Sequence, residues 1–206
     1  MKNTVVRLLA ALMMVCLTAC SSTPRPTQES RQGSLVPYEL TERESALLEV
    51  LGVKDRAQII EFHAPEGVKS VAVQVHRLRQ DGAWNTETAF AFGFETSETN
   101  TISDGFFAMI LGENNSIEFH VSHNSSHMSS KTDEIILEAE AIASTTSFLG
   151  NAVDLVLDQE IPVAFLVYDS DGHMPGASVE DYFEPSAFHG MDLVQAVTLT
   201  FSSEPL

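Results

Sequence analysis

The stretch Ile117-Glu-Phe-His-Val-Ser122 alternates apolar and polar side chains at every position. A period of two places the apolar residues on one face of a β-strand and the polar residues on the other. This stretch therefore predicts a half-buried strand, with Phe119 in the core and Glu118 facing solvent.

The same period recurs along most of the chain after Gly52. We expect strands at residues 58–63, 70–76, 88–95, 102–111, 117–122, 135–140, 153–157, 163–168 and 197–201. Turn sequences such as Gln80-Asp-Gly82 and Asp171-Gly172 separate these strands. Short strands with frequent turns predict an all-β fold, namely a two-sheet antiparallel β-sandwich with jelly-roll or immunoglobulin-like topology.

One short helix is expected before the strands, at about residues 42–51. Thr41 and Glu44 match a capping box, and Gly52 suits the position just after the helix. The apolar stripe of this helix consists of Leu47, Leu48 and Leu51. We expect the stripe to pack against the end of a sheet. A membrane-surface helix is the alternative, but such helices usually have a basic face, which is absent here.

The N-terminus has the layout of an export signal. Lys2 and Arg7 supply positive charge, an apolar run covers residues 8–17, and Leu17-Thr-Ala-Cys20 ends the segment. The last four residues resemble the lipobox of bacterial lipoproteins. The resemblance implies cleavage before Cys20, a lipid (diacylglyceryl and palmitate) on its sulfur, and anchoring to the extracytoplasmic face of a membrane. The alternatives are an ordinary secretory signal or a membrane span, but a span needs about 20 apolar residues.

Three segments are expected. Residues 1–19 form the signal peptide, residues 20–38 a lipidated flexible linker rich in Ser, Thr and Pro, and residues 39–206 a single β-sandwich domain. The two cysteines, Cys16 and Cys20, are then both accounted for. No thiol remains in the domain for a disulfide, a thiolate metal site or a nucleophile.

The chain is strongly acidic, with 29 Asp and Glu residues against 11 Lys and Arg residues and a formal net charge of −18. Nucleic-acid binding is disfavoured, because its affinity depends on Lys and Arg at phosphates. Contact between the domain and an anionic bilayer is disfavoured for the same reason, so the lipid is the expected membrane contact. No cofactor is expected apart from the covalent lipid.

Three histidines, His120, His123 and His127, lie within eight residues and are weak candidates for a metal site. On a continuous strand His120 and His123 point to opposite faces, because their separation is odd. His127 follows in a Ser- and Asn-rich stretch that is expected to be a loop and could fold back. Solvent-facing histidines are the favoured interpretation.

The longest connection lies between residues 168 and 193, and long loops in compact domains are often functional. A short helix is expected from Ser178, with Asp181 as its capping partner, ending before Pro185. The loop combines aromatic, acidic and imidazole groups, and the candidate binding residues are Asp169, Asp171, His173, Tyr182, Phe183 and His189. A lid that buries its aromatics over one end of the sandwich is the alternative, and a calcium loop at Asp169 fails the EF-hand spacing.

The sequence lacks the nucleophile-elbow, Ser-x-x-Lys and His-Glu-x-x-His motifs, and no catalytic residue is assigned. We therefore expect a binding or structural role at the bacterial cell envelope, not an enzyme. The alternative function is a metal-dependent extracytoplasmic hydrolase that uses the surface histidines.

Overall fold

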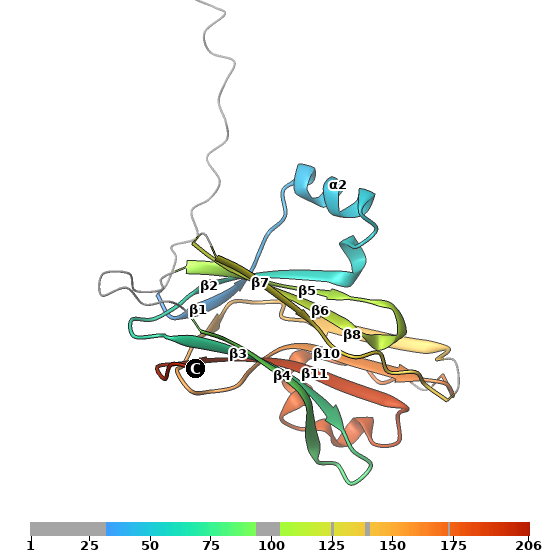
Figure 1. Cartoon of the computed structure of the whole chain (residues 1–206). Helices are drawn as coiled ribbons and strands as arrows, with labels where there is room; N and C mark the ends of the chain where they lie inside the picture. The colour runs from blue at the N-terminus through green and yellow to red at the C-terminus, as the bar shows by residue number, and fades with distance from the viewer. Residues whose placement is uncertain (1–31, 94–103, 125, 139–140, 173) are drawn as a thin grey trace, which may run out of the picture. The chain divides into compact units, whose positions relative to one another are not determined.

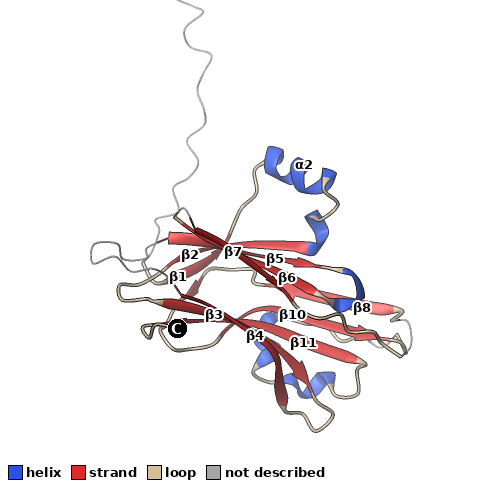
Figure 2. Cartoon of the chain, viewed as in Figure 1, coloured by secondary structure: helices blue, strands red, loops and turns tan. Residues whose placement is uncertain are grey.

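The computed structural model describes residues 32–93, 104–124, 126–138, 141–172 and 174–206. The signal sequence and Cys20 lie outside these ranges, as does His173. The described part of the chain forms two layers of antiparallel β-sheet (Figures 1 and 2), which confirms the expected all-β sandwich.

The first layer is a six-stranded sheet in the order β7-β6-β5-β2-β1-β9. Its strands are β1 (Ser34–Pro37), β2 (Ala57–His63), β5 (Asp104–Leu111), β6 (Ile117–His123), β7 (Ser126–Lys131) and β9 (Val153–Asp154). The second layer is a five-stranded sheet in the order β4-β3-β11-β10-β8. Its strands are β3 (Ser70–Leu78), β4 (Trp84–Gly93), β8 (Ala143–Phe148), β10 (Ile161–Asp169) and β11 (Leu193–Ser202).

The alternating residues of both sheets meet in one core. Phe119 of β6 is fully buried and stacks on Phe107 of β5, and Phe90 of β4 approaches it from the other sheet. Glu118, the neighbour of Phe119, is only partly buried and lies on the opposite face. The register expected for β6 is therefore confirmed.

Three strands lie where the sequence indicated loops or linker. Ser34–Pro37, expected to end the linker, pairs with both β2 and β9. Ser126–Lys131 and Ala143–Phe148 are rich in Ser and Thr, yet they form the edge strands β7 and β8. Each of these segments has a more apolar strand beside it that supplies backbone partners, so a weak local pattern is sufficient.

The strand expected at residues 135–140 is wrong for residues 135–138, and residues 139 and 140 are outside the described ranges. The backbone of Ile135 instead bonds to the turn η3 (Glu113–Asn115): its N–H donates to Asn114 O, and its carbonyl accepts from the Asn115 side chain. Ile136 is left exposed. The expected strand at 153–157 is reduced to the two residues of β9.

The expected helix is present as α2 (Glu42–Val50), followed by the short turn η2 (Lys54–Arg56). The capping box of Thr41 and Glu44 is complete, and Gly52 has a φ of 68°. The expected packing is wrong, however, because α2 contains no buried residue and Val50 is 86% exposed. Figure 1 shows α2 standing away from the six-stranded sheet.

The long connection between β10 and β11 covers the outer face of the five-stranded sheet, not an end of the sandwich. It contains η4 (Val179–Tyr182) and η5 (Pro185–Phe188), which Figure 2 shows on the side of β10 and β11 away from the other sheet. Ser178 caps η4 in a box with Asp181, as expected. Phe188 is buried and packs 4.9 Å from Phe165, centroid to centroid, in a second apolar cluster.

Among the described residues, the helices are all too short or too polar to cross a membrane.

Candidate functional site

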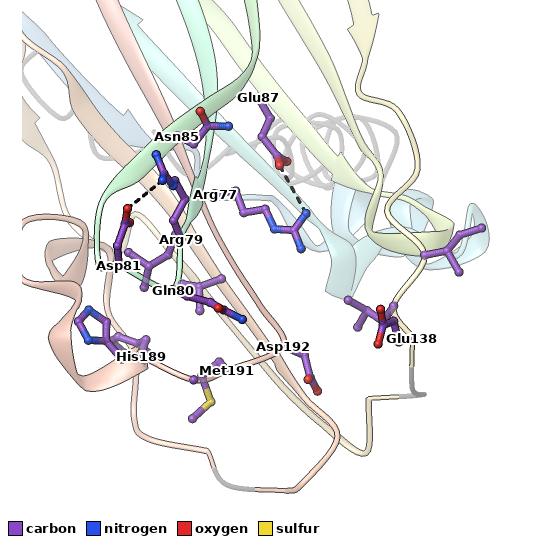
Figure 3. Close-up of a pocket in the computed structure, with 16 residues that line it drawn as sticks. Arg77, Arg79, Gln80, Asp81, Asn85, Glu87, Glu138, His189, Met191 and Asp192 are labelled. Atoms are coloured by element: carbon purple, nitrogen blue, oxygen red, sulfur yellow. Dashed lines mark hydrogen bonds and ion pairs between the residues drawn. The ribbon is translucent and has the colours of Figure 1, made fainter.

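A cleft of about 890 Å³, here called the hairpin cleft, lies beside the turn between β3 and β4 (Figure 3). One wall is the β3–β4 hairpin, a second is the segment 136–138, and a third is the segment 188–192 that leads into β11. Its charged and amide side chains are Arg77, Arg79, Gln80, Asp81, Asn85, Glu87, Glu138 and Asp192.

Both arginines of the cleft come from β3 and its turn, and a carboxylate holds each one. Arg77 lies 3.5 Å from Glu87, measured from Nη1 to Oε1, and Arg79 lies 2.8 Å from Asp81, measured from Nη2 to Oδ2. Figure 3 shows both pairs on the hairpin wall. A guanidinium held by one carboxylate keeps further N–H donors for a ligand, so these pairs offer donors and acceptors side by side.

His189 connects the long segment to the hairpin turn. A Cβ atom at Gly82 would lie 2.7 Å from His189 Nε2, and Gly82 has a φ of +83°. Only glycine therefore permits both the turn geometry and the close approach of the imidazole. This contact brings the segment 188–192 against the hairpin, although the two are far apart in sequence.

Two acidic residues complete the walls of the cleft. The side chain and the backbone N–H of Ser170 donate hydrogen bonds that lower the pKa of Asp192, and the N–H to Oδ2 distance is 2.6 Å. Glu138 lies across the cleft on the segment 136–138 (Figure 3). Because four carboxylates accompany two arginines, the lining is polar and slightly acidic. Its apolar residues are Leu78, Ile136, Leu137, Phe188, Met191 and Val194.

Beneath η4, aromatic and polar groups attach the long segment to the sheet. Trp84 Nε1 donates to the carbonyl of Tyr182 at 2.9 Å, and the Tyr182 hydroxyl donates to Glu160 at 2.6 Å. Burial and the Glu160 carboxylate raise the pKa of Tyr182 well above its usual range. The Trp84 and Tyr182 rings lie 5.3 Å apart, so this part of the segment is packed and not open.

His76 is the buried titratable group at the centre of this network. Its ring nitrogens lie 3.0 Å from the hydroxyl of Thr198 and 3.0 Å from that of Thr86. Burial lowers the pKa of His76, and the Glu160 carboxylate 3.6 Å away opposes that shift in part. Burial between two hydroxyls thus favours the neutral form of the His76 imidazole.

The candidate residues of the long loop do not converge on one site. Asp169 is buried and Asp171 is exposed at the turn after β10. Tyr182 points inward to Glu160, whereas Phe183 is 62% exposed, with its ring centroid 5.4 Å from that of Tyr182. Of the candidates in the described ranges, only His189 lines the hairpin cleft.

The three clustered histidines are divided between the faces of the six-stranded sheet, as the odd spacing predicts. His120 lies 3.0 Å from Glu118 and faces His127, with the ring centroids 5.5 Å apart. His127 lies on β7 and not in a loop, so the chain does fold back. His123 bonds instead to the carbonyl of Asp104. Within the described residues, no three His, Cys, Asp or Glu side chains form a group that could hold a metal ion.

Sequence reasoning missed most of the hairpin cleft. The sequence patterns assign no role to Arg77, Arg79 or Glu87. One signal was present: these charges flank Gln80-Asp-Gly82, and the chain has few other basic residues. The contributions of Glu138 and Asp192 depend on chain segments that only the fold brings to the hairpin.

Comparison with known proteins finds no matching family model, no matching curated protein and no matching solved structure.

Proposed function

We propose that this chain is a lipid-anchored, extracytoplasmic protein of the bacterial cell envelope, and that its β-sandwich binds a polar ligand in the hairpin cleft. The anchor rests on the resemblance of Leu17-Thr-Ala-Cys20 to a lipobox. The binding role rests on one observation: two arginine–carboxylate pairs line a cleft of about 890 Å³. This volume is within the usual range of small-molecule sites.

The lining indicates the kind of ligand. Arg77 and Arg79 are balanced by Asp81 and Glu87, and Glu138 and Asp192 add negative charge. A polyanion is therefore disfavoured, and a wholly apolar ligand would cover these charged side chains without pairing with them. A neutral or zwitterionic molecule with several hydroxyl, amino or carboxyl groups fits these alternating donors and acceptors.

Thermal unfolding in the presence of simple sugars and amino acids tests the proposal. A ligand that binds only the folded state raises Tm progressively as its free concentration exceeds Kd. We expect at least one compound of this polar panel to raise the Tm of the unsubstituted chain. The double variant Arg77→Ala/Arg79→Ala should lose that shift.

The matched control is Lys131→Ala, which removes an exposed cation on β7, away from the cleft. This variant should keep the full Tm shift. The proposed site is wrong if the double variant and Lys131→Ala respond to every compound as the unsubstituted chain does.

A further inference from the structure

Strand β8 is an edge of the five-stranded sheet without the usual protection against pairing. Within the described residues, its backbone pairs with β10 alone. Its sequence, Ala-Ser-Thr-Thr-Ser-Phe, has no charge, no proline and no bulge. The other edges are blunted in familiar ways: β9 has two residues, β7 carries Lys131, and β4 carries Glu87 beside a bulge.

An exposed apolar side chain lies at one end of β8, and a pocket lies at the other end. Ile142 immediately precedes the strand and is 73% exposed. The pocket has a volume of about 290 Å³, and its apolar lining includes Phe148, Leu149, Val153 and Val179. The same edge therefore carries a protruding side chain and a hollow of matching chemistry.

Two-fold symmetry brings the protruding side chain to the hollow. When two β8 strands pair antiparallel about an axis perpendicular to the sheet, only residues of the same face lie opposite each other. Two registers pair most of the strand. In the first the axis passes between the Thr145 residues of the two copies, and in the second it passes between their Thr146 residues. Ile142 lies opposite Phe148 of the second copy in the first register and opposite Gly150 in the other. Both residues line the pocket.

We propose that two copies of this chain associate through β8, forming one continuous sheet in which Ile142 of each copy enters the pocket of the other. The pairing places Thr and Ser side chains opposite each other, and such cross-strand pairs are favourable. The contact buries no unpaired charge from the strand itself. The occupant of this edge is therefore a second copy of the chain.

The net charge makes the association dependent on salt. Each copy has a formal charge of −18 over its full sequence, so two copies repel each other at long range. Salt screens this repulsion and leaves the uncharged strand contact intact. The fraction of dimer should therefore rise with ionic strength, which is opposite to the behaviour of an interface built from ion pairs.

Sedimentation of the full-length chain at increasing concentration tests the association. We expect a monomer–dimer equilibrium that shifts toward dimer in salt. Thr146→Lys places two like charges near the axis, and Ile142→Asp replaces the protruding apolar side chain. Both positions are exposed in the single chain, so both variants should remain folded and become monomeric. Ser129→Lys, at an exposed position on the edge strand β7 of the six-stranded sheet, is the matched control and should dimerise normally.

Cysteine cross-linking tests the strand pairing itself. Thr145→Cys or Thr146→Cys places two thiols near the axis, where facing Cβ atoms lie about 5 Å apart. One of these variants should yield a dimer with a short bismaleimide, and the identity of that variant gives the register. Ser129→Cys is the control, and the unsubstituted chain reports any cross-link through Cys16 or Cys20.

The proposal is overturned if the chain stays monomeric in high salt up to about 1 mM, the Kd of very weak association. It is also overturned if dimers form but Thr146→Lys and Ile142→Asp dimerise as well as Ser129→Lys. Cross-linking of Ser129→Cys in preference to both β8 variants would place the interface on the other sheet.

Discussion

At the scale of single residues, adjacent positions on β6 differ sharply in what they contribute to stability. Phe119 is fully buried against Phe107 and Phe90, so Phe119→Ala should cost about 3–5 kcal/mol of unfolding free energy. Glu118→Ala should cost about 1 kcal/mol or less, because its pair with His120 is partly exposed. Urea melts of the two variants measure both changes. Equal losses at the two positions would contradict the register of β6.

His76 should make stability depend on pH. Burial lowers its pKa in the folded state from the ordinary value of 6.5. Below about pH 6.5 the unfolded chain therefore takes up a proton before the folded chain does, and stability falls as the pH falls. Above that pH both states hold His76 neutral, and it contributes no pH dependence.

The measurement compares urea melts of the unsubstituted chain and His76→Gln at neutral pH and near pH 5. We expect the unsubstituted chain to lose more stability on acidification. Glu160 and Tyr182 face His76 and are unchanged in the variant, so their titration is common to both proteins. Identical losses would show that His76 is not the titrating group.

At the scale of elements, two capping boxes should differ in their effect on the whole domain. Thr41 caps α2, which has no buried residue, whereas Ser178 caps η4, where Val179 is buried. Thr41→Ala should destabilise α2 locally by about 1 kcal/mol and leave the Tm of the domain nearly unchanged. Ser178→Ala should lower the Tm, because η4 is packed on β10.

Amide hydrogen exchange distinguishes the two outcomes. In Thr41→Ala, faster exchange should be confined to residues 42–52. In Ser178→Ala, the fluorescence of Trp84, the single tryptophan, should also change, because Trp84 Nε1 donates to the Tyr182 carbonyl. A large fall in Tm for Thr41→Ala would mean that α2 contributes packing to the folded domain.

At the scale of the whole molecule, the expected location depends on one sulfur atom. If Cys20 carries the lipid, Cys20→Ala should be left uncleaved or released in soluble form, while the unsubstituted protein fractionates with membranes. A single acyl chain binds membranes only marginally, so a stable anchor requires the diacylated cysteine. Palmitate labelling and cell fractionation measure this. A mature-length, palmitate-labelled Cys20→Ala protein in the membrane fraction would contradict the lipobox prediction.

The excess of acidic over basic residues is also a property of the whole molecule. With 29 acidic and 11 basic residues, the chain concentrates two of its arginines on one hairpin, within a cleft that other acidic segments complete. The net charge predicts that the chain is repelled by anionic surfaces, but it does not predict that two arginines lie together on this hairpin.

Features that form between near neighbours in the chain could be predicted from the sequence. The period of two identified the buried face of β6, because alternation along a strand can be recognised without knowing the partner strands. Thr41 with Glu44 and Ser178 with Asp181 were both correct as capping boxes, because each box closes within four residues. The class of fold followed from the number of such strands and turns.

Features that depend on partners distant in sequence could not be predicted and became known from the fold. β1, β7 and β8 are strands because neighbouring strands supply their backbone hydrogen bonds. Ile135 is not part of a strand, because its backbone N–H and carbonyl form hydrogen bonds with Asn114 and Asn115 instead. The exposure of α2 likewise could not be read from its apolar stripe. The hairpin cleft forms because His189 packs on Gly82 across more than a hundred residues of chain. Such contacts are set by sheet order and register, and neither is encoded in a short stretch of sequence.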